Sequence, residues 1–275
     1  MTTSNNILKT IVLTVMFIAV FCIVQRMGYD PITNVPYSGA STLGHPALVG
    51  KACLTAIPLA LYLAMSASNL SLRIAYSLSG VILMAGLIAS KSRAAELGAV
   101  AAIFTLLWFI PQRLIKAALI ITLILGILAV SMYGKWAIEK DDNAFGLQTR
   151  LHFWEAGLQI IKDNVFFGIG LDVLRQVYPY YQTRAHLDLQ PNTAVSKIHS
   201  QYLNIAISSG ILSLLFYLWF LYEVLKNGQG DMLGICLTAS IIGCLVQDLF
   251  DWQDIANSML FYIILGLKVR RQYDT

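Results

Sequence analysis

The chain has 275 residues, of which 57% are apolar and only 12% are charged, with a formal net charge of +4; its mean hydropathy is +0.67. Soluble domains contain about 45–50% apolar and about 25% charged residues, so this composition excludes an ordinary water-soluble protein. The small net charge gives no reason to expect a nucleic-acid partner. We therefore expect an all-α polytopic membrane protein.

Apolar segments recur along the chain, and each approaches the roughly 20 residues that a helix needs to cross the hydrocarbon layer. They predict about eight transmembrane helices, at residues 10–26, 47–65, 74–90, 95–110, 117–133, 203–222, 232–250 and 254–268. In the first segment, Lys9 precedes an apolar run and no small-residue cleavage site follows it. We expect an uncleaved anchor helix there rather than a signal peptide. The cysteines, at 22, 53, 236 and 244, fall in or beside apolar segments, where we expect small buried hydrophobic side chains.

The basic residues of the short connections predict the orientation, because cytoplasmic loops carry an excess of Lys and Arg. One side of the predicted bundle would carry Lys9, Arg73, Arg113, Lys116, Lys226, Lys268, Arg270 and Arg271. The other side's short loops and helix ends would carry only Arg26, Lys51, Lys91 and Arg93. We therefore expect both termini in the cytoplasm and the connections 27–46, 91–94, 134–202 and 248–254 on the outer side.

The connection 134–202 is too long for a simple link between helices, and long structured loops often carry function. It divides the chain into N-terminal membrane helices (1–133), an outer loop (134–202) and C-terminal membrane helices with a basic tail (203–275). Within the loop, residues 149–163 predict a short amphipathic helix whose apolar face would be formed by Leu151, Trp154, Leu158 and Ile161. The glycines of Phe167-Gly168-Ile169-Gly170 would end that helix.

Two arginines on the outer side are candidates for binding an anion. Arg93 lies between two predicted helices, where it could either extend to lipid headgroups or hold a diphosphate with its fork of donors. Arg150 opens the predicted loop helix, one turn before Trp154. A cation at a helix N-terminus opposes the helix dipole, which favours a functional reason for its position.

The outer side also carries groups that could move a proton. His199 lies where the loop re-enters the membrane and could act as a general base near neutral pH, although His186 is about equally well placed. A cluster of aspartates, Asp248, Asp251 and Asp254, lies at the outer end of the seventh predicted helix. Carboxylates so close to hydrocarbon suggest a functional site, and a solvated turn is the alternative. The tyrosines of 178–181 could stack on sugars or form an interfacial aromatic belt. No histidine has the spacing of a metal ligand set, so we expect no metal and no cofactor.

These outward-facing motifs occur in a characteristic order. Residues 39–46 (Gly-Ala-Ser-Thr-Leu-Gly-His-Pro) are followed by Ser92-Arg93-Ala94, Arg150 with Trp154, Phe167-Gly168-Ile169-Gly170, and His199-Ser-x-Tyr-Leu203 with Gly210. The set resembles the O-antigen ligase and O-antigen polymerase superfamily, which includes the pilin-type O-oligosaccharyltransferases. The similarity extends from about residue 39 to 266.

The resemblance implies a GT-C-like membrane glycosyltransferase at the periplasmic face of the bacterial inner membrane. It implies transfer of a glycan from undecaprenyl diphosphate to an acceptor hydroxyl, without metal or nucleotide sugar. By motif position, Arg93 and Arg150 would hold the diphosphate and His199 would activate the acceptor. Asp251, with Asp248 as the second choice, would be the acidic residue of the site, and Trp154 would contribute to substrate binding.

The leading hypothesis is therefore an O-antigen ligase that uses lipid A–core as the acceptor. A polymerase that joins one lipid-linked glycan to another shares the donor, fold and motifs, and stays open as the alternative. A lipid-linked-sugar transporter is less favoured, because the predicted helix interiors are nearly free of charge. A non-catalytic homologue that binds polyprenyl lipids, or a transferase that glycosylates a pilin serine, also stays open.

Overall fold

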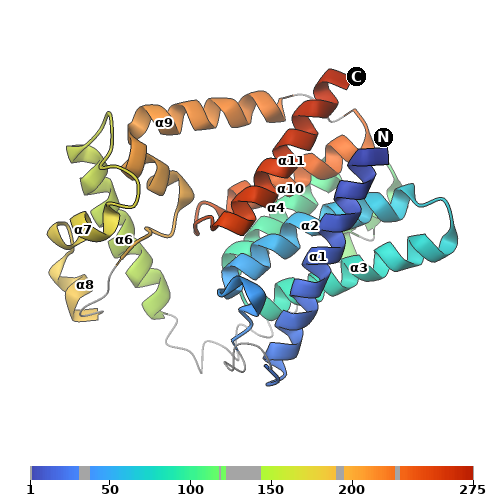
Figure 1. Cartoon of the computed structure of the whole chain (residues 1–275), viewed down its shortest axis with the longest axis horizontal. Helices are drawn as coiled ribbons and strands as arrows, with labels where there is room; N and C mark the ends of the chain where they lie inside the picture. The colour runs from blue at the N-terminus through green and yellow to red at the C-terminus, as the bar shows by residue number, and fades with distance from the viewer. Residues whose placement is uncertain are drawn as a thin grey trace. The chain divides into compact units, whose positions relative to one another are not determined.

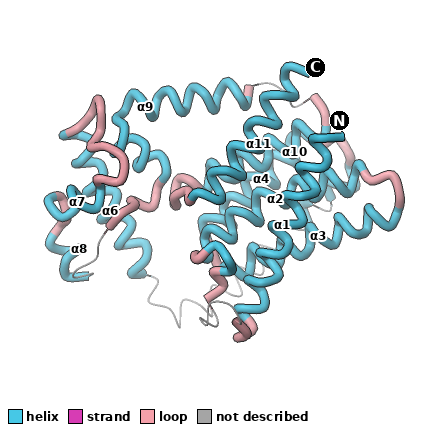
Figure 2. Tube along the Cα trace, in the orientation of Figure 1, coloured by secondary structure: helices cyan, strands magenta, loops and turns pink. Residues whose placement is uncertain are grey.

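The computed structural model describes residues 2–30, 38–117, 119–121, 144–189, 195–226 and 230–274, and these residues contain helices and no strand (Figures 1 and 2). The all-α class is thereby confirmed. The long helices are α1 (Thr2–Arg26), α2 (Pro46–Ser66), α3 (Leu70–Ser90), α4 (Arg93–Phe109), α6 (Ala144–Asp163), α9 (Gln201–Leu225), α10 (Met232–Gln247) and α11 (Ile255–Asp274). The short elements are η1 (Ser41–Leu43), α7 (Leu174–Val177), η2 (Tyr178–Tyr180) and α8 (Arg184–Leu189).

The predicted membrane segments correspond to helices α1 to α4 and α9 to α11, whereas segment 117–133 lies mostly outside the described residues. Among the described helices, those long and apolar enough to cross a membrane are Ser4–Arg26, Pro46–Ser66, Leu70–Ser90 and Gln201–Leu225. Helix α10 is apolar but shorter. The chain is a membrane protein, and the total of eight spans stays a prediction.

The chain forms two compact units. Unit 1 comprises Met1–Leu119, Val224–Gln247 and Gln253–Thr275, and unit 2 comprises Ile120–Glu223 and Asp248–Trp252. The first unit therefore holds α1 to α4, α10 and α11. The second holds α6 to α8, nearly all of α9 and a short segment that follows α10.

Helices of unit 1 pack closely because small residues lie where they cross, as is common in membrane helix pairs. A Cβ atom added to Gly98 of α4 would lie 2.5 Å from the carbonyl oxygen of Gly243 in α10. The same test at Gly86 of α3 places a Cβ 2.5 Å from that of Ala19 in α1. The cysteines are buried, as the sequence predicts: Cys22, Cys53, Cys236 and Cys244.

Polar side chains at one end of unit 1 bind the backbone ends of neighbouring helices. Arg26 of α1 donates to the carbonyl oxygen of Ala89 in α3 at 2.7 Å. Gln247 at the end of α10 donates to the carbonyl oxygen of Ala47 at the start of α2 at 3.0 Å. The helix ends that the predicted topology assigns to the outer side therefore meet at one end of the unit.

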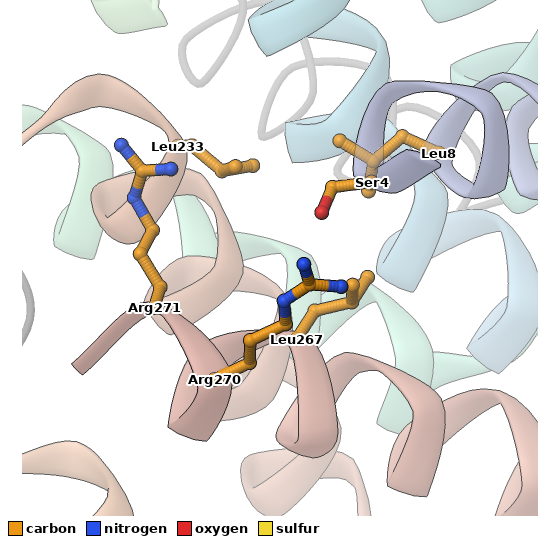
Figure 3. Close-up of a pocket in the computed structure, with 6 residues that line it drawn as sticks. All are labelled: Ser4, Leu8, Leu233, Leu267, Arg270 and Arg271. Atoms are coloured by element: carbon orange, nitrogen blue, oxygen red, sulfur yellow. The ribbon is translucent and has the colours of Figure 1, made fainter. Parts of the chain in front are cut away.

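The opposite end of unit 1 contains the chain's basic C-terminal residues. Arg271 forms an ion pair with Asp231, which precedes α10. Lys268 is buried and donates to the hydroxyl of Thr238 at 2.7 Å. A small pocket at this end is lined by Ser4, Leu8, Leu233, Leu267, Arg270 and Arg271 (Figure 3). Lys268, Arg270 and Arg271 therefore lie at this end of unit 1, and the orientation in the membrane stays a prediction.

Helix α6 confirms the predicted loop helix, but it begins at Ala144, and only part of the predicted apolar face packs on the core. Its buried residues include Phe153, Ala156, Gly157 and Ile160. Of the predicted apolar face, Trp154 and Ile161 pack on the same core, whereas Leu151 and Leu158 are 52% and 58% exposed. The prediction for the face was therefore correct for Trp154 and Ile161 and wrong for Leu151 and Leu158, because α6 carries apolar residues on both sides. Periodicity then does not identify which side meets the core. That core also includes Leu174, Tyr178, Val195, Ile198 and Ile207.

Helix α9 is broken at Gly210, where the sequence predicts one continuous helix over 203–222. Gly210 has φ 84° and ψ 170°, a conformation that side chains other than glycine rarely adopt. The break frees carbonyl groups of α9, and the segment after α6 binds them. Ile169 and Gly170 donate backbone N–H groups to the carbonyl oxygens of Ile207 and Ser208 at 2.8 and 3.0 Å.

The same contact is completed from the other side of the break. The N–H of Ile211 donates to the carbonyl oxygen of Val165 at 2.8 Å. A Cβ atom on Gly168 would clash with the carbonyl oxygen of Ile207, and one on Gly210 with that of Phe166. We call residues 165–170 and 207–211 together the Gly210 clasp. The glycines of the motif therefore do more than end α6, because they allow two irregular backbones to pair.

Candidate functional site

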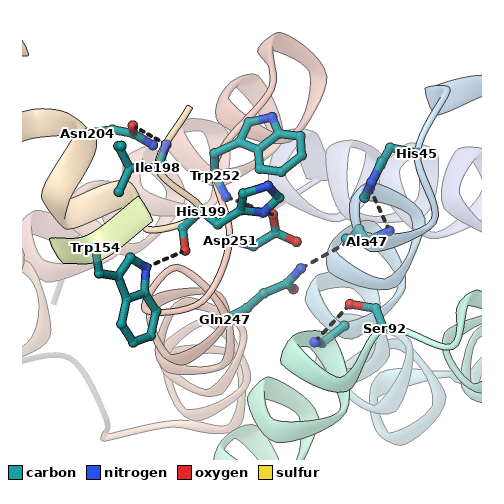
Figure 4. Close-up of polar contacts among 11 residues, drawn as sticks. His45, Ala47, Ser92, Trp154, Ile198, His199, Asn204, Gln247, Asp251 and Trp252 are labelled. Atoms are coloured by element: carbon teal, nitrogen blue, oxygen red, sulfur yellow. Dashed lines mark hydrogen bonds and ion pairs between the residues drawn. The ribbon is translucent and has the colours of Figure 1, made fainter. Parts of the chain in front are cut away.

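His199 lies two residues before α9, in a backbone conformation that is unusual for a residue other than glycine. Its φ is 52°, in the left-handed region, and such strained residues cluster at functional sites. Side chains of unit 2 hold the backbone on both sides. Asn204 accepts the N–H of Ile198 at 3.1 Å, and the indole of Trp154 donates to the carbonyl oxygen of His199 at 3.4 Å (Figure 4).

The imidazole of His199 is held between two aromatic rings. Phe153 of α6 is stacked on it, with ring centroids 5.5 Å apart and an interplanar angle of 5°. Trp252 meets it edge to face at 4.6 Å. Because these rings cover two sides of the imidazole, its plane is set by packing, while its side chain stays 26% exposed. A held but accessible imidazole is suited to exchanging a proton with a bound molecule.

A buried carboxylate faces one nitrogen of this imidazole. Oδ1 of Asp251 lies 3.8 Å from Nδ1 of His199, and the Asp251 side chain is only 1% exposed (Figure 4). The same oxygen accepts the N–H of Trp252 at 3.0 Å. The pair is within ion-pair distance and beyond hydrogen-bond distance, and catalytic hydrogen bonds often tighten only in the substrate complex.

This arrangement has a definite chemical use. A carboxylate at Nδ1 favours the tautomer that carries its proton there, which leaves Nε2 as the acceptor. The negative charge also stabilises the imidazolium that forms when Nε2 takes a proton. His199 and Asp251 can therefore act together as a general base.

The other aspartates of the cluster have different surroundings. Asp248 is fully buried, and its carbonyl oxygen accepts the N–H of Gln201 at 2.9 Å. It thereby binds the start of α9 to the segment that carries Asp251. Asp254 caps α11, because its carboxylate accepts the N–H of Asn257 at 3.1 Å. Of the three, the structure brings Asp251 beside His199.

Arg150 is a half-exposed residue within α6. The helix begins at Ala144, so the expectation that Arg150 opens it was wrong, and the argument from an unfavourable dipole at the N-terminus does not apply. Residues 144–148 are helical as well, so α6 begins earlier than the sequence predicts. Arg150 is still one turn before Trp154, whose half-buried ring packs on the core of unit 2 and lies 6.2 Å from that of Phe250.

Arg93 belongs to unit 1, where it is the first residue of α4 and is exposed. Lys91, with φ 53°, ends α3, and the hydroxyl of Ser92 accepts the N–H of Ala95 at 3.3 Å to begin α4. Gly50 of α2 makes room for this turn, because a Cβ there would lie 2.7 Å from that of Ala95. The Ser-Arg motif is thus a tight helix-to-helix turn that presents a guanidinium to solvent.

The structure distinguishes His186 from His199. His186 is fully buried, and its Nδ1 is 2.7 Å from the phenol oxygen of Tyr178, which is also buried. Burial raises the pKa of Tyr178 above its ordinary value, so the phenol stays neutral and the contact is a hydrogen bond within the core. His186 therefore has the environment of a structural residue.

The tyrosines beside it do not form one surface. Tyr178 lies in the core, whereas Tyr180 is 87% exposed. Tyr181 donates to a carboxylate oxygen of Asp163 at 2.9 Å, and this hydrogen bond raises the pKa of Tyr181. Residues 178–181 therefore do not form a continuous surface on which sugars could stack.

Phe153 and Trp252 were missed by sequence reasoning, although they contact the imidazole of His199. Phe153 and Trp252 are the sequence neighbours of Trp154 and Asp251, which the motifs identify, and this proximity was the signal that could have indicated them. Lys51 of α2 was also missed as a polar group of the core, being only 1% exposed. Within the described residues, no group of three or more His, Cys, Asp and Glu side chains is arranged to hold a metal ion.

Comparison with protein families identifies a relationship for this chain. A family model described as O-antigen ligase matches residues 78–218, about half of the chain, from within α3 to the second part of α9. The matched region includes Arg93, Arg150 and His199, whereas Asp251 lies beyond it. A comparison with curated proteins gives no match. The O-antigen ligase family comprises membrane glycosyltransferases of the ligase and polymerase type, and this chain belongs to it.

Proposed function

We propose that the chain is a membrane glycosyltransferase that transfers a glycan from undecaprenyl diphosphate to an acceptor hydroxyl, and that it acts as an O-antigen ligase on lipid A–core. The observation that carries this proposal is the accessible imidazole of His199, which faces the buried carboxylate of Asp251. A general base is what an acceptor hydroxyl requires, and it contributes about 10²–10⁴ in rate.

In the proposed reaction, Nε2 of His199 takes the proton of the acceptor hydroxyl as its oxygen attacks the anomeric carbon of the glycan. The bond between that carbon and the diphosphate oxygen breaks, and undecaprenyl diphosphate leaves with the electron pair. Asp251 holds the imidazole and balances its positive charge. The proton is released from His199 before the next cycle.

The donor's negative charge calls for permanent cations. Arg93 at the start of α4 and Arg150 on α6 are the proposed diphosphate ligands, because a guanidinium binds phosphate oxygens with paired donors. Cations held in place also stabilise the charge that develops on the leaving diphosphate. Trp154 is proposed to contribute to substrate binding, and Asp248 would support the segment that carries Asp251.

The proposal places the chain in the bacterial inner membrane with both termini in the cytoplasm and the site facing the periplasm. Its support is the distribution of basic residues, which gathers Lys268, Arg270 and Arg271 at the end of unit 1 opposite to Arg93. The donor, the acceptor and the surrounding lipids are the proposed partners, and no metal is required for the base.

The site is tested by comparing aspartate and histidine variants of the full chain in liposomes that contain a lipid-linked oligosaccharide. We expect His199→Ala and Asp251→Asn to lower the initial rate of transfer by about 10²–10⁴ and at least 10-fold, respectively. Asp254→Asn is the matched control, because asparagine also caps a helix, and it should keep the wild-type rate. Wild-type rates for both His199→Ala and Asp251→Asn would overturn the site.

The acceptor is tested in the same liposomes, with and without lipid A–core, by mass spectrometry of the products. Glycosylated lipid A–core that depends on His199 supports a ligase. Longer lipid-linked glycans that form without lipid A–core would assign the same site to a polymerase. The absence of product from the intact chain with either acceptor would contradict both reactions.

A further inference from the structure

The segment that follows α6 exposes large apolar side chains. Phe166, Phe167 and Leu171 are 64%, 88% and 80% exposed. Burial of apolar surface stabilises by about 25 cal/mol per Å², so a cluster of three such side chains in water is unfavourable. Exposed apolar patches of this kind mark a surface that contacts another apolar phase.

The Gly210 clasp determines where this segment lies along α9. Val165 accepts the N–H of Ile211, so Phe166 and Phe167 are held at the level at which the second part of α9 begins. That part also exposes apolar side chains, among them Leu212, Leu215, Phe216 and Trp219. Both surfaces therefore adjoin one another in unit 2.

The length of α9 then relates the clasp to the bilayer. Residues 211–225 would cover about 21 Å at about 1.5 Å per residue, less than the hydrocarbon thickness of about 30 Å. If α9 spans the membrane over its full range Gln201–Leu225, the clasp lies within the hydrocarbon layer. If the span begins at the break, the clasp lies at the layer's boundary. In both cases Phe166 and Phe167 meet lipid.

An irregular segment at membrane depth must have its backbone groups paired, and three consecutive N–H groups of this one are paired. Gly168 donates to the carbonyl oxygen of Asn164 at 3.0 Å, and Ile169 and Gly170 donate to the carbonyl oxygens freed by the break in α9. These backbone groups are therefore bound inside unit 2, while the side chains of Phe166, Phe167 and Leu171 stay exposed. A non-helical segment that faces lipid requires this combination of paired backbone groups and exposed apolar side chains.

We propose that residues 165–171 form a re-entrant loop that inserts into the acyl chains of the leaflet on the side of His199. The occupant of this surface is lipid rather than a second protein, because the loop continues the exposed apolar face of a candidate membrane span. The loop fixes the depth of unit 2, and with it the distance of His199 from the membrane surface. This inference does not depend on the proposed reaction.

The test is electron paramagnetic resonance of a nitroxide attached to Phe167→Cys or to Tyr180→Cys in the full chain in phosphatidylglycerol and phosphatidylcholine liposomes. These two positions are matched, since their side chains are 88% and 87% exposed, and the native cysteines are buried. We expect the nitroxide at 167 to collide more with oxygen than with a water-soluble nickel chelate. The nitroxide at 180 should show the reverse preference.

Leu171→Cys provides a second site in the loop in case Phe167→Cys does not fold, and the same preference for oxygen is expected there. Equal access of the nickel chelate to the loop positions and to position 180 would overturn the proposal. Low collision rates with both reagents at 167 and 171 would also overturn it, because they would show burial against protein instead of lipid.

Discussion

Glycines and polar side chains have different roles in the two units. In unit 1, glycines such as Gly98 bring regular helices into contact, and polar side chains such as Gln247 bind the ends of neighbouring helices. In unit 2, Gly210 interrupts a helix, and polar side chains converge on His199. The difference shows that the proposed chemistry lies where backbone regularity is lost, while the regular helices form the surrounding scaffold.

The largest effect is expected when the interruption of α9 at Gly210 is removed. Gly210→Ala introduces a Cβ that clashes with the carbonyl oxygen of Phe166 and penalises φ 84°. We expect a loss of about 4 kcal/mol or more in stability, an effect that is exceptional for one substitution. The measurement is the fraction of folded chain recovered in detergent, with transfer activity as a second readout.

Gly266→Ala is the matched control in α11, because a Cβ there has no neighbouring heavy atom within 4 Å. In a helix interior, alanine is favoured over glycine by about 0.5–1 kcal/mol, so this variant should be at least as stable as the wild type. Equal recovery of the two variants would show that the break in α9 is dispensable.

A smaller effect is expected where a glycine serves helix packing in unit 1. Gly98→Ala forces α4 away from Gly243, and overpacking of this kind costs about 1–3 kcal/mol. The midpoint of thermal unfolding in detergent should fall. Gly80→Ala, whose Cβ would meet its nearest neighbour at an ordinary 3.9 Å, should not lower the midpoint. A lower midpoint for Gly80→Ala than for Gly98→Ala would contradict the close packing of α4 on α10.

The smallest effect on stability concerns the face of α6. Phe153→Leu keeps an apolar side chain and should cost about 1 kcal/mol, but it removes the ring stacked on His199. We expect transfer to fall about 10-fold, by about 1.4 kcal/mol of barrier, with a changed pH dependence of the rate. Phe153→Tyr keeps an aromatic ring at this position, so it should retain the wild-type transfer rate and pH dependence.

Leu151→Ala on the exposed side of α6 should change neither stability nor the pH dependence. If Leu151→Ala alters the pH profile while Phe153→Leu does not, the face predicted from the sequence, rather than the observed one, would carry the site.

Much of the helical architecture could be predicted from the sequence. The apolar segments identify α1 to α4 and α9 to α11, and the amphipathic pattern of 149–163 identifies α6. The buried face of α6 could not be predicted, because Leu151 and Leu158 are as apolar as the residues that are buried. The break at Gly210 could not be predicted either, since a single glycine inside an apolar run is also compatible with a continuous helix.

By itself, the sequence determined that the chain is a helical membrane protein, because its apolar content leaves no soluble alternative, and the order of its motifs indicated the family. Tertiary structure decided which of several equivalent polar residues lie together. Asp251 faces His199, Asp254 caps a helix and His186 is buried against Tyr178. The contact between His199 and Asp251 joins residues that are distant in the sequence, so it depends on how the chain folds and no local pattern encodes it.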